Sequence, residues 1–210
     1  SGDDIYNLQD EYQSRGNSSL ELNTGAGTDT VNVNSNLTGA SFNLGDGDDT
    51  INVAKKINSY YWNYIRGQGG NDIINIENGA NRYLSIDGGH GNDSLILAGD
   101  FTSNIYLDGG YGKDTIDISN ATGLITSQSG NQSITGDWGD DSLIGNNQGN
   151  ILFGGHDDDI FNAGGGNDII YGGYDYSAKG NDGSVDIAVF SGSSNDYKVS
   201  RATDSTFGYV

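Results

Sequence analysis

The sequence predicts an all-β solenoid, an elongated fold in which each coil holds two short strands. One observation is a run of nine-residue units, at a strict period, from Gly136 to Asp175. A second is a glycine-rich turn that recurs upstream at intervals of 20 to 23 residues, each time followed by a short alternating apolar and polar stretch. Self-similarity at a fixed period is the sequence signature of repeat folds, in which each coil packs only against its neighbours.

Composition agrees with such a fold and excludes several classes of protein. Hydrophobic residues make up 33% of the chain, which is thin for a compact core but sufficient for a narrow solenoid. The net charge of −20, from 29 acids and 9 bases, argues against nucleic acid and anionic membrane surfaces as partners and in favour of cations. There is no Cys, so disulfides and thiolate zinc sites are excluded, and no apolar stretch is long enough to span a membrane.

Residues 1–135 form the first predicted region, with coils of about 21 residues. Its turns read TGAGTD, LGDGDD, GQGGND, GGHGND and GGYGKD, and each is followed by a stretch such as DTVNV, in which Val31 and Val33 share one side. Period 2 indicates a half-buried strand. A second short strand, such as ASFNL, precedes the next glycine turn, so we expect every glycine turn of this region on the same edge.

Residues 136–175 form the second predicted region, where GDWGDDSLI, GNNQGNILF, GGHDDDIFN and AGGGNDIIY follow one another. One coil then takes two units, so successive turns alternate between the two edges. Turns on the same edge are 18 residues apart, which predicts that Asp141 stacks on Asp159 and that Asn150 stacks on Asp168.

Residues 176–210 form the third predicted region. The segment from Asp175 to Asp182 reads as an acidic insertion, and VDIAVF and the residues after it read as the start of a β-cap that closes the open apolar end of the array. A partial copy of the turn, SGDDIY, opens the chain, so we interpret the sequence as a piece of a longer protein.

The nonapeptide resembles G-G-x-G-x-D-x-U-x, the repeat of the RTX (repeats-in-toxin) calcium-binding proteins. This resemblance covers nearly the whole chain and implies a right-handed parallel β-roll that binds several calcium ions in its turns. Calcium takes six to eight oxygen ligands, from carboxylates, backbone carbonyls and water. Glycine at the first, second and fourth turn positions is expected to permit positive φ and to turn carbonyls inward, and the sixth-position Asp supplies charge.

The resemblance assigns metal-binding roles to the turn glycines and acids of both regions. In the first region these are Gly25, Gly27, Asp29, Gly45, Gly47, Asp49, Gly67, Gly70, Asp72, Gly88, Gly89, Gly91, Asp93, Gly109, Gly110, Gly112 and Asp114. In the second they are Gly136, Gly139, Asp141, Gly154, Gly155, Asp157, Asp159, Gly164, Gly166 and Asp168.

Some turns depart from the family pattern. Asn150 replaces the sixth-position acid and Gln148 the fourth-position glycine, so we expect weak or no calcium binding in that turn. The 27-residue gap between Asp114 and Asp141 makes an ion between these two the least secure. The alternative to calcium is a Gly/Asp-rich solenoid without bound metal.

Other candidate sites are weaker, and we predict no catalytic residues. His90 and His156 occupy the variable third turn position without a zinc-binding spacing, which favours surface residues. The aromatic cluster from Tyr60 to Tyr64 has two interpretations: packing of an insertion against the roll, which we favour, or stacking on sugars. The third position varies from coil to coil, which argues against an ice-binding face.

The resemblance further implies a non-enzymatic module of a large secreted or surface-located bacterial protein. Such proteins leave the cell unfolded through the type I secretion machinery and fold on extracellular calcium. We favour an adhesin as the parent protein, with any cell-surface or glycan ligand bound by other domains. The alternatives are an accessory module of a secreted enzyme acting on polysaccharide, protein or lipid, and a calcium-dependent surface-layer subunit.

Overall fold

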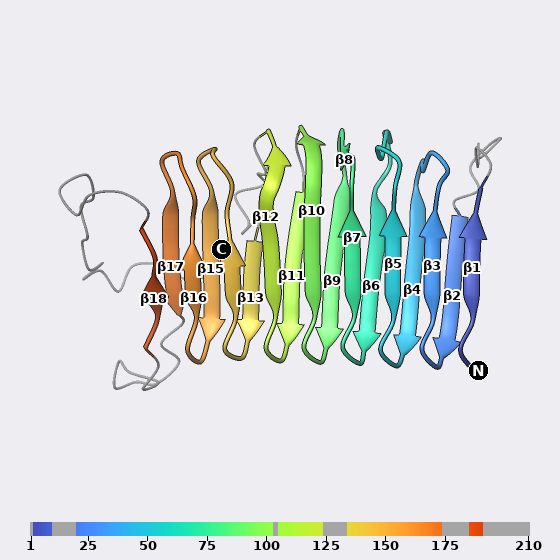
Figure 1. The fold of residues 1–210 in the computed structure, drawn as a ribbon, viewed down its shortest axis with the longest axis horizontal. Coiled ribbons are helices and arrows are strands. Elements are labelled where there is room, and N and C mark those ends of the chain that lie inside the picture. The colour runs from blue at the N-terminus through green and yellow to red at the C-terminus, as the bar shows by residue number, and fades with distance from the viewer. Residues whose placement is uncertain (1, 10–19, 103–104, 124–133, 174–184, 191–210) are drawn as a thin grey trace.

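The computed structural model describes residues 2–9, 20–102, 105–123, 134–173 and 185–190. These residues form 18 strands and no helix, and every strand pairs with its neighbours in parallel. The strands form two sheets that face each other along one long axis, with the chain passing from one sheet to the other (Figure 1). The predicted parallel β-solenoid with two strands per coil is therefore confirmed.

The first sheet, sheet A, contains the strands that follow the glycine-rich turns. In spatial order these are β1 (Ile5–Leu8), β3 (Thr30–Val33), β5 (Thr50–Val53), β7 (Ile73–Ile76), β10 (Ser94–Phe101), β12 (Thr115–Thr122), β14 (Ser142–Ile144), β16 (Ile160–Asn162) and β18 (Ile187–Ala188), with β8 (Gly79–Ala80) beside β10.

The second sheet, sheet B, contains the strands that lead into those turns. From one end of the sheet to the other they are β17 (Ile169–Gly173), β15 (Ile151–His156), β13 (Ile134–Trp138), β11 (Ile105–Tyr111), β9 (Leu84–His90), β6 (Asn63–Gly69), β4 (Ala40–Asp46) and β2 (Leu20–Ala26). In Figure 1 the strands of sheet A run upward in front of the downward strands of sheet B while the chain advances from right to left, which makes the coil right-handed.

The core is a narrow layer between the sheets, filled by one inward row from each strand. Val31 of β3 pairs in register with Ile51 of β5, and Ile51 with Ile74 of β7, and all three are fully buried. From sheet B, Phe42 pairs with Ile65 and supplies the opposing row. Because side chains alternate across a strand, the residues between them face outward and are polar in most coils.

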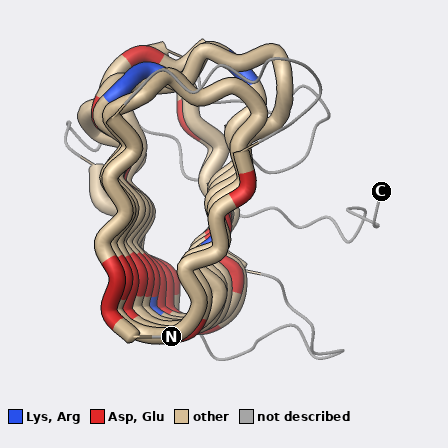
Figure 2. Tube along the Cα trace, turned by 90° about the vertical axis from the view of Figure 1, so that its right-hand side faces the viewer, with Lys and Arg blue, Asp and Glu red and all other residues tan. Residues whose placement is uncertain are grey.

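The turns of the solenoid lie on two edges. The glycine edge consists of the turns 24–29, 44–49, 67–72, 88–93, 109–114, 136–141 and 154–159, all of which lead from sheet B to sheet A. The opposite edge consists of the turns that lead from sheet A to sheet B, including 145–150 and 163–168. Viewed along the solenoid axis, acidic residues stack in rows at the glycine edge (Figure 2).

Beyond residue 173 the described chain is short. Residues 185–190 include β18, which extends sheet A beside β16 through the pairs Ile160 with Ile187 and Phe161 with Ala188. These residues therefore continue the solenoid, while the whole of the predicted acidic insertion and the remainder of the predicted cap lie outside the described residues. None of the described residues forms a helix with the length and hydrophobicity needed to cross a bilayer.

Candidate metal centre

A row of aspartates runs along the inside of the glycine edge, and we call it the carboxylate ladder. Each member directly precedes a strand of sheet A, so its side chain shares the inward face with the buried residues two and four positions later. The seven inner members are at most 2% exposed. The ladder consists of Asp4, Asp29, Asp49, Asp72, Asp93, Asp114, Asp141, Asp159 and Asp186.

One oxygen of each carboxylate joins neighbouring coils. The N–H of Asp72 donates to Oδ1 of Asp93 at 2.8 Å, and the N–H of Asp93 donates to Oδ1 of Asp114 at 2.7 Å. The same bond recurs between every consecutive pair of the ladder, with distances from 2.6 to 3.1 Å. It also spans the 27-residue interval between Asp114 and Asp141, so the longer connection there does not break the ladder.

The second oxygen of each inner carboxylate is buried and has no hydrogen-bond partner. This holds for Oδ2 of Asp29, Asp49, Asp72, Asp93, Asp114, Asp141 and Asp159. A buried polar atom without a partner is costly, and a buried charge is more so. Seven such atoms in one row indicate a shared unmet requirement for a positive charge or a proton.

In five coils a backbone carbonyl oxygen lies close to the orphaned carboxylate oxygen. Oδ2 of Asp114 and the carbonyl oxygen of Gly136 lie 2.6 and 2.8 Å from the point that a Cβ on Gly109 would occupy. The pair formed by Asp93 Oδ2 and the Gly109 carbonyl meets the position of a Cβ on Gly88 in the same way. Two acceptors therefore converge with no donor between them.

The expectation that the first-position glycines adopt positive φ is wrong. Gly67, Gly88, Gly109, Gly136 and Gly154 do not adopt positive φ. They are glycine for a spatial reason, because a Cβ at each would collide with the carboxylate of its own turn and the carbonyl of the next coil.

Burial raises the pKa of six ladder carboxyls, those of Asp49, Asp72, Asp93, Asp114, Asp141 and Asp159. It brings the pKa of Asp72, Asp114 and Asp159 to about 7, that of Asp141 to about 8 and that of Asp93 to about 6. Desolvation is the largest cause, and neighbouring carboxylates such as Asp93 beside Asp114 raise the pKa further, while the hydrogen bond from the preceding coil lowers it. A bound cation would reverse this balance and keep the carboxyls ionised.

The second and fourth turn positions require positive φ, as predicted. Gly110 has a φ of 104° and Gly112 one of 138°. Gln68 and Asp137 adopt the same conformation at the second position, and Asp157 adopts it at the fourth with a φ of 77°. Asp157 is exposed and lies outside the ladder, so the structure does not bring this predicted site residue together with the others.

The turns of the opposite edge carry a different arrangement. The N–H of Asn150 donates to Oδ1 of Asp168 at 2.9 Å, so these two stack as their 18-residue spacing predicts. The Asn150 side chain is fully paired: its Oδ1 accepts the N–H of Asn146 and its Nδ2 donates to Oδ1 of Asn146 at 3.1 Å. No orphaned oxygen remains on Asn150.

The sequence analysis missed the two ends of the ladder. The N–H of Asp4 donates to Asp29 at 2.7 Å, and Asp186 accepts the N–H of Asp159 at 3.1 Å. The partial turn SGDDIY points to the first. The stretch DIAVF, an aspartate followed directly by a short apolar run, is the signal that could have identified the second.

The candidate ligand atoms of the glycine edge suit a hard cation such as calcium, because all of them are oxygens, from carboxylates and backbone carbonyls. They are arranged as a row, with one free carboxylate oxygen per coil. Consistent with a row, the described residues contain no group of three or more His, Cys, Asp or Glu side chains positioned to hold one metal ion. Any ion here would take its ligands from successive coils and from the backbone.

A stack of aromatic rings runs along the third turn positions, next to the carboxylate ladder in sequence. The ring of Tyr111 lies 4.8 Å from that of His90 and 5.8 Å from that of Trp138, and Trp138 lies 3.9 Å from His156. The two histidines therefore belong to a stack across four coils, which a turn-by-turn inspection of the sequence did not reveal.

No protein-family model matches this chain, and no curated protein or solved structure matches it either.

Proposed function

We propose that this chain is a calcium-binding module whose folding depends on calcium. The observation that carries the proposal is the row of seven buried carboxylate oxygens without partners, five of which lie close to a backbone carbonyl oxygen. A divalent cation between two acceptors would satisfy both at once. Calcium fits better than magnesium, because it accepts flexible geometry and many carbonyl ligands, whereas magnesium demands near-ideal octahedral geometry and retains its water.

Calcium binding would supply free energy of folding. Without cations, a chain of net charge −20 repels itself when compact, and its thin core must also offset the loss of chain entropy. An ion that binds only the folded form stabilises that form by mass action. The module would therefore be unfolded at low calcium and folded at extracellular calcium.

The parent protein that we propose is secreted or surface-located. The resemblance of the nonapeptides to RTX repeats supports export through a type I machinery in the unfolded state, followed by folding outside the cell. An adhesin remains our preferred parent, with an accessory module of a secreted enzyme and a surface-layer subunit as alternatives. The residues preceding this segment in the parent would distinguish them, because tandem adhesive repeats, a catalytic domain and an anchoring domain differ in sequence.

The test is a calcium titration of the 210-residue chain followed by far-UV circular dichroism, with magnesium in parallel. The ladder variant combines Asp72→Ala, Asp93→Ala and Asp114→Ala. The control combines Glu21→Ala, Asp46→Ala and Glu77→Ala, which removes the same number of charges from exposed positions. We expect a cooperative gain of β signal with calcium alone, shifted to higher calcium concentration in the ladder variant and not in the control.

Two results would contradict the proposal. A wild-type chain that is fully folded in chelator and indifferent to calcium would show that the turns fold without metal. An equal shift in the ladder variant and in the control would show that calcium only screens net charge.

A further inference from the structure

The opposite edge carries a hollow of about 320 Å³. Three successive coils contribute to it, and its volume is at the small end of the range for ligand pockets. The hollow is lined by Asn58, Ser59, Tyr60, Asn81, Arg82 and Thr102. None of these residues belongs to the carboxylate ladder, so the hollow is separate from the proposed calcium sites.

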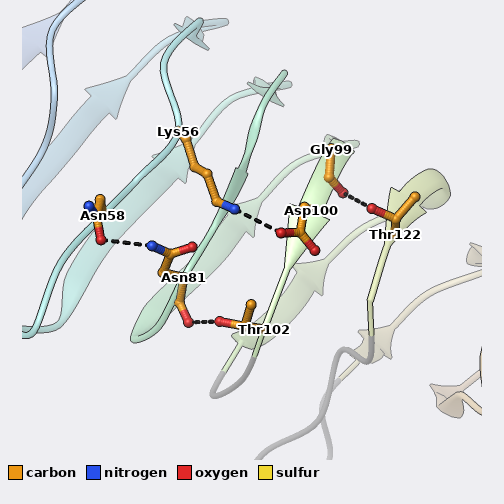
Figure 3. A network of polar contacts seen from close by, with 7 residues as sticks. All are labelled: Lys56, Asn58, Asn81, Gly99, Asp100, Thr102 and Thr122. Atoms are coloured by element: carbon orange, nitrogen blue, oxygen red, sulfur yellow. Dashed lines mark hydrogen bonds and ion pairs between the residues drawn. The ribbon is translucent and has the colours of Figure 1, made fainter.

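Two amides form a fixed pair on its wall. Nδ2 of Asn81 donates to Oδ1 of Asn58 at 2.7 Å, and the hydroxyl of Thr102 donates to the backbone carbonyl of Asn81 (Figure 3). Among the described residues, neither Nδ2 of Asn58 nor Oδ1 of Asn81 has a hydrogen-bond partner. One amide donor and one amide acceptor are thus held at adjacent positions, and both remain available.

An exposed aromatic ring borders these amides. The side chain of Tyr60 is 78% exposed, which is unusual for a large ring on an ordered turn. The guanidinium carbon of Arg82 lies 5.3 Å from the centre of the Tyr60 ring and covers one of its faces. The other face has no ring or cation against it among the described residues.

The turn that carries Tyr60 is held firmly in place. The hydroxyl of Ser59 donates to the carbonyl of Tyr61 at 2.7 Å and accepts the N–H groups of Gly39 and Tyr61, both at 3.0 Å. On the other side, Nδ2 of Asn63 donates to the Tyr61 carbonyl at 3.2 Å. The ring is therefore presented by a preorganised backbone, which lowers the entropy lost on binding.

The aromatic cluster thus divides into two parts. Trp62 packs against Tyr64 and Tyr83, with ring centres 6.0 and 5.4 Å apart, as the packing interpretation predicts. Tyr60 and Tyr61, at 78% and 67% exposure, are not used in this packing. The hollow lies beside the exposed part.

We propose that this hollow binds a neutral saccharide. A sugar ring has an apolar C–H face that stacks on an aromatic ring, and hydroxyls that both donate and accept, which matches the free face of Tyr60 and the amide pair. Arg82 adds N–H donors directed at hydroxyl or ring oxygens. Polyanions fit less well, because Arg82 is the one cation that lines the hollow and the chain carries a net charge of −20.

The test is a glycan microarray that carries neutral and uronic-acid oligosaccharides, probed with the full 210-residue chain in calcium-containing buffer. Neutral ligands retained on the array are then titrated calorimetrically against the wild type, Tyr60→Ala and Arg82→Ala. The matched control is Tyr111→Ala, which removes an exposed tyrosine from the glycine edge. Circular dichroism confirms that each variant is folded.

We expect Tyr60→Ala to weaken binding about tenfold or more, since a stacked aromatic contact contributes about that much, and Tyr111→Ala to bind like the wild type. The proposal is overturned if no neutral glycan is retained or if folded Tyr60→Ala binds unchanged. It is also overturned if Tyr111→Ala loses as much affinity as Tyr60→Ala, or if only uronic-acid glycans bind.

Discussion

The two edges of the solenoid solve the same packing problem in different ways. On both edges an aspartate at the sixth turn position accepts the N–H of the corresponding residue in the preceding coil: the buried Asp141 accepts that of Asp114, and the half-buried Asp168 accepts that of Asn150. On the glycine edge this side chain is an aspartate whose second oxygen has no partner. On the opposite edge the buried member is Asn150, and both polar atoms of its amide bond to Asn146.

This difference indicates what the aspartates are for. If filling the buried sixth position were the whole requirement, an amide with both polar atoms paired within its own turn would fulfil it without burying a charge, as Asn150 does. Seven buried carboxylates in sequence carry a cost that the opposite edge avoids. The difference between the edges therefore supports a bound ligand at the glycine edge.

The largest expected effect is a pH dependence of the calcium-free chain. Burial raises the pKa of Asp72, Asp114 and Asp159 from 3.8 to about 7 and that of Asp141 to about 8. Between about pH 4 and 8 the folded chain therefore binds more protons than the unfolded chain, so stability is greatest at the acidic end and is lost as the pH rises. In chelator, circular dichroism should show a folded chain near pH 5 and a largely unfolded one near pH 8.

Calcium should remove this pH dependence by substituting for the protons. Replacing Asp72, Asp93 and Asp114 together by Asn should flatten the profile, because neutral amides do not titrate. A profile of wild-type steepness in this triple variant would assign the pH dependence to exposed acids instead.

The next effect concerns glycines of the two edges. Gly112 has a φ of 138°, and a Cβ there would collide with the carbonyl oxygen of Gly91. Gly112→Ala should lower the free energy of unfolding by about 3 kcal/mol, from backbone strain together with the steric clash. Gly165 on the opposite edge lacks positive φ, and the nearest atom to a Cβ there is a side-chain oxygen of Asn147 at 3.1 Å.

Gly165→Ala should therefore change stability by less than about 0.5 kcal/mol. Denaturant unfolding of both variants in calcium measures the difference. Similar losses at the two positions would mean that the tight stacking of the glycine edge is not what limits stability.

A smaller effect is expected when the buried aspartate of the glycine edge and the buried asparagine of the opposite edge are each replaced by the other residue type. Asp141→Asn places an N–H₂ group where Oδ2 now faces the Gly154 carbonyl, which allows a hydrogen bond in place of two opposed acceptors. We expect a calcium-free chain that is more stable at pH 8, with a weaker response to calcium. Asn150→Asp turns an oxygen toward Oδ1 of Asn146 and should cost about 1–2 kcal/mol in chelator.

Thermal unfolding with and without calcium measures both exchanges. The comparison fails if Asp141→Asn destabilises the chain as strongly in chelator as in calcium, because the second oxygen would then have no specific role.

The smallest effect concerns the ion pair of the opposite edge. Nζ of Lys56 lies 2.8 Å from Oδ2 of Asp100, and both side chains are more than a third exposed (Figure 3). Exposed pairs contribute little, so Lys56→Ala should lower the free energy of unfolding by no more than about 0.5 kcal/mol. A loss above about 1.5 kcal/mol in denaturant unfolding would show that this edge depends on charge after all.

Much of the glycine edge was predictable from sequence. The period-2 alternation of Thr30–Val33 and its counterparts fixes which residues face inward, and the spacing of the sixth-position acids fixes which coil lies on which. Spacing does not reveal which oxygen of a carboxylate is used. The hydrogen bond from Asp93 to Asp114 and the orphaned Oδ2 beside it were therefore not predictable from the sequence.

The opposite edge was less predictable, because its connections differ in length from coil to coil. The hollow beside Tyr60 depends on how three unequal turns lie against one another, which no repeat pattern specifies. Asp186 was missed for a related reason: an insertion separates it from Asp159, so its place in the array follows from pairing and not from period.

The hydrogen bonds of the carboxylate ladder all run the same way, so the array has a polarity like that of a filament with two unlike ends. The N–H of Asp29 uses the carboxylate of Asp49, which belongs to the coil after it. A coil joined before an existing array needs to contribute only a backbone N–H, which every residue except proline supplies. A coil joined after it must bring a carboxylate or an amide. Duplication of repeats can therefore lengthen such an array at its beginning with almost any residue at the sixth turn position. At its end the added coil needs an acid or an amide at that position.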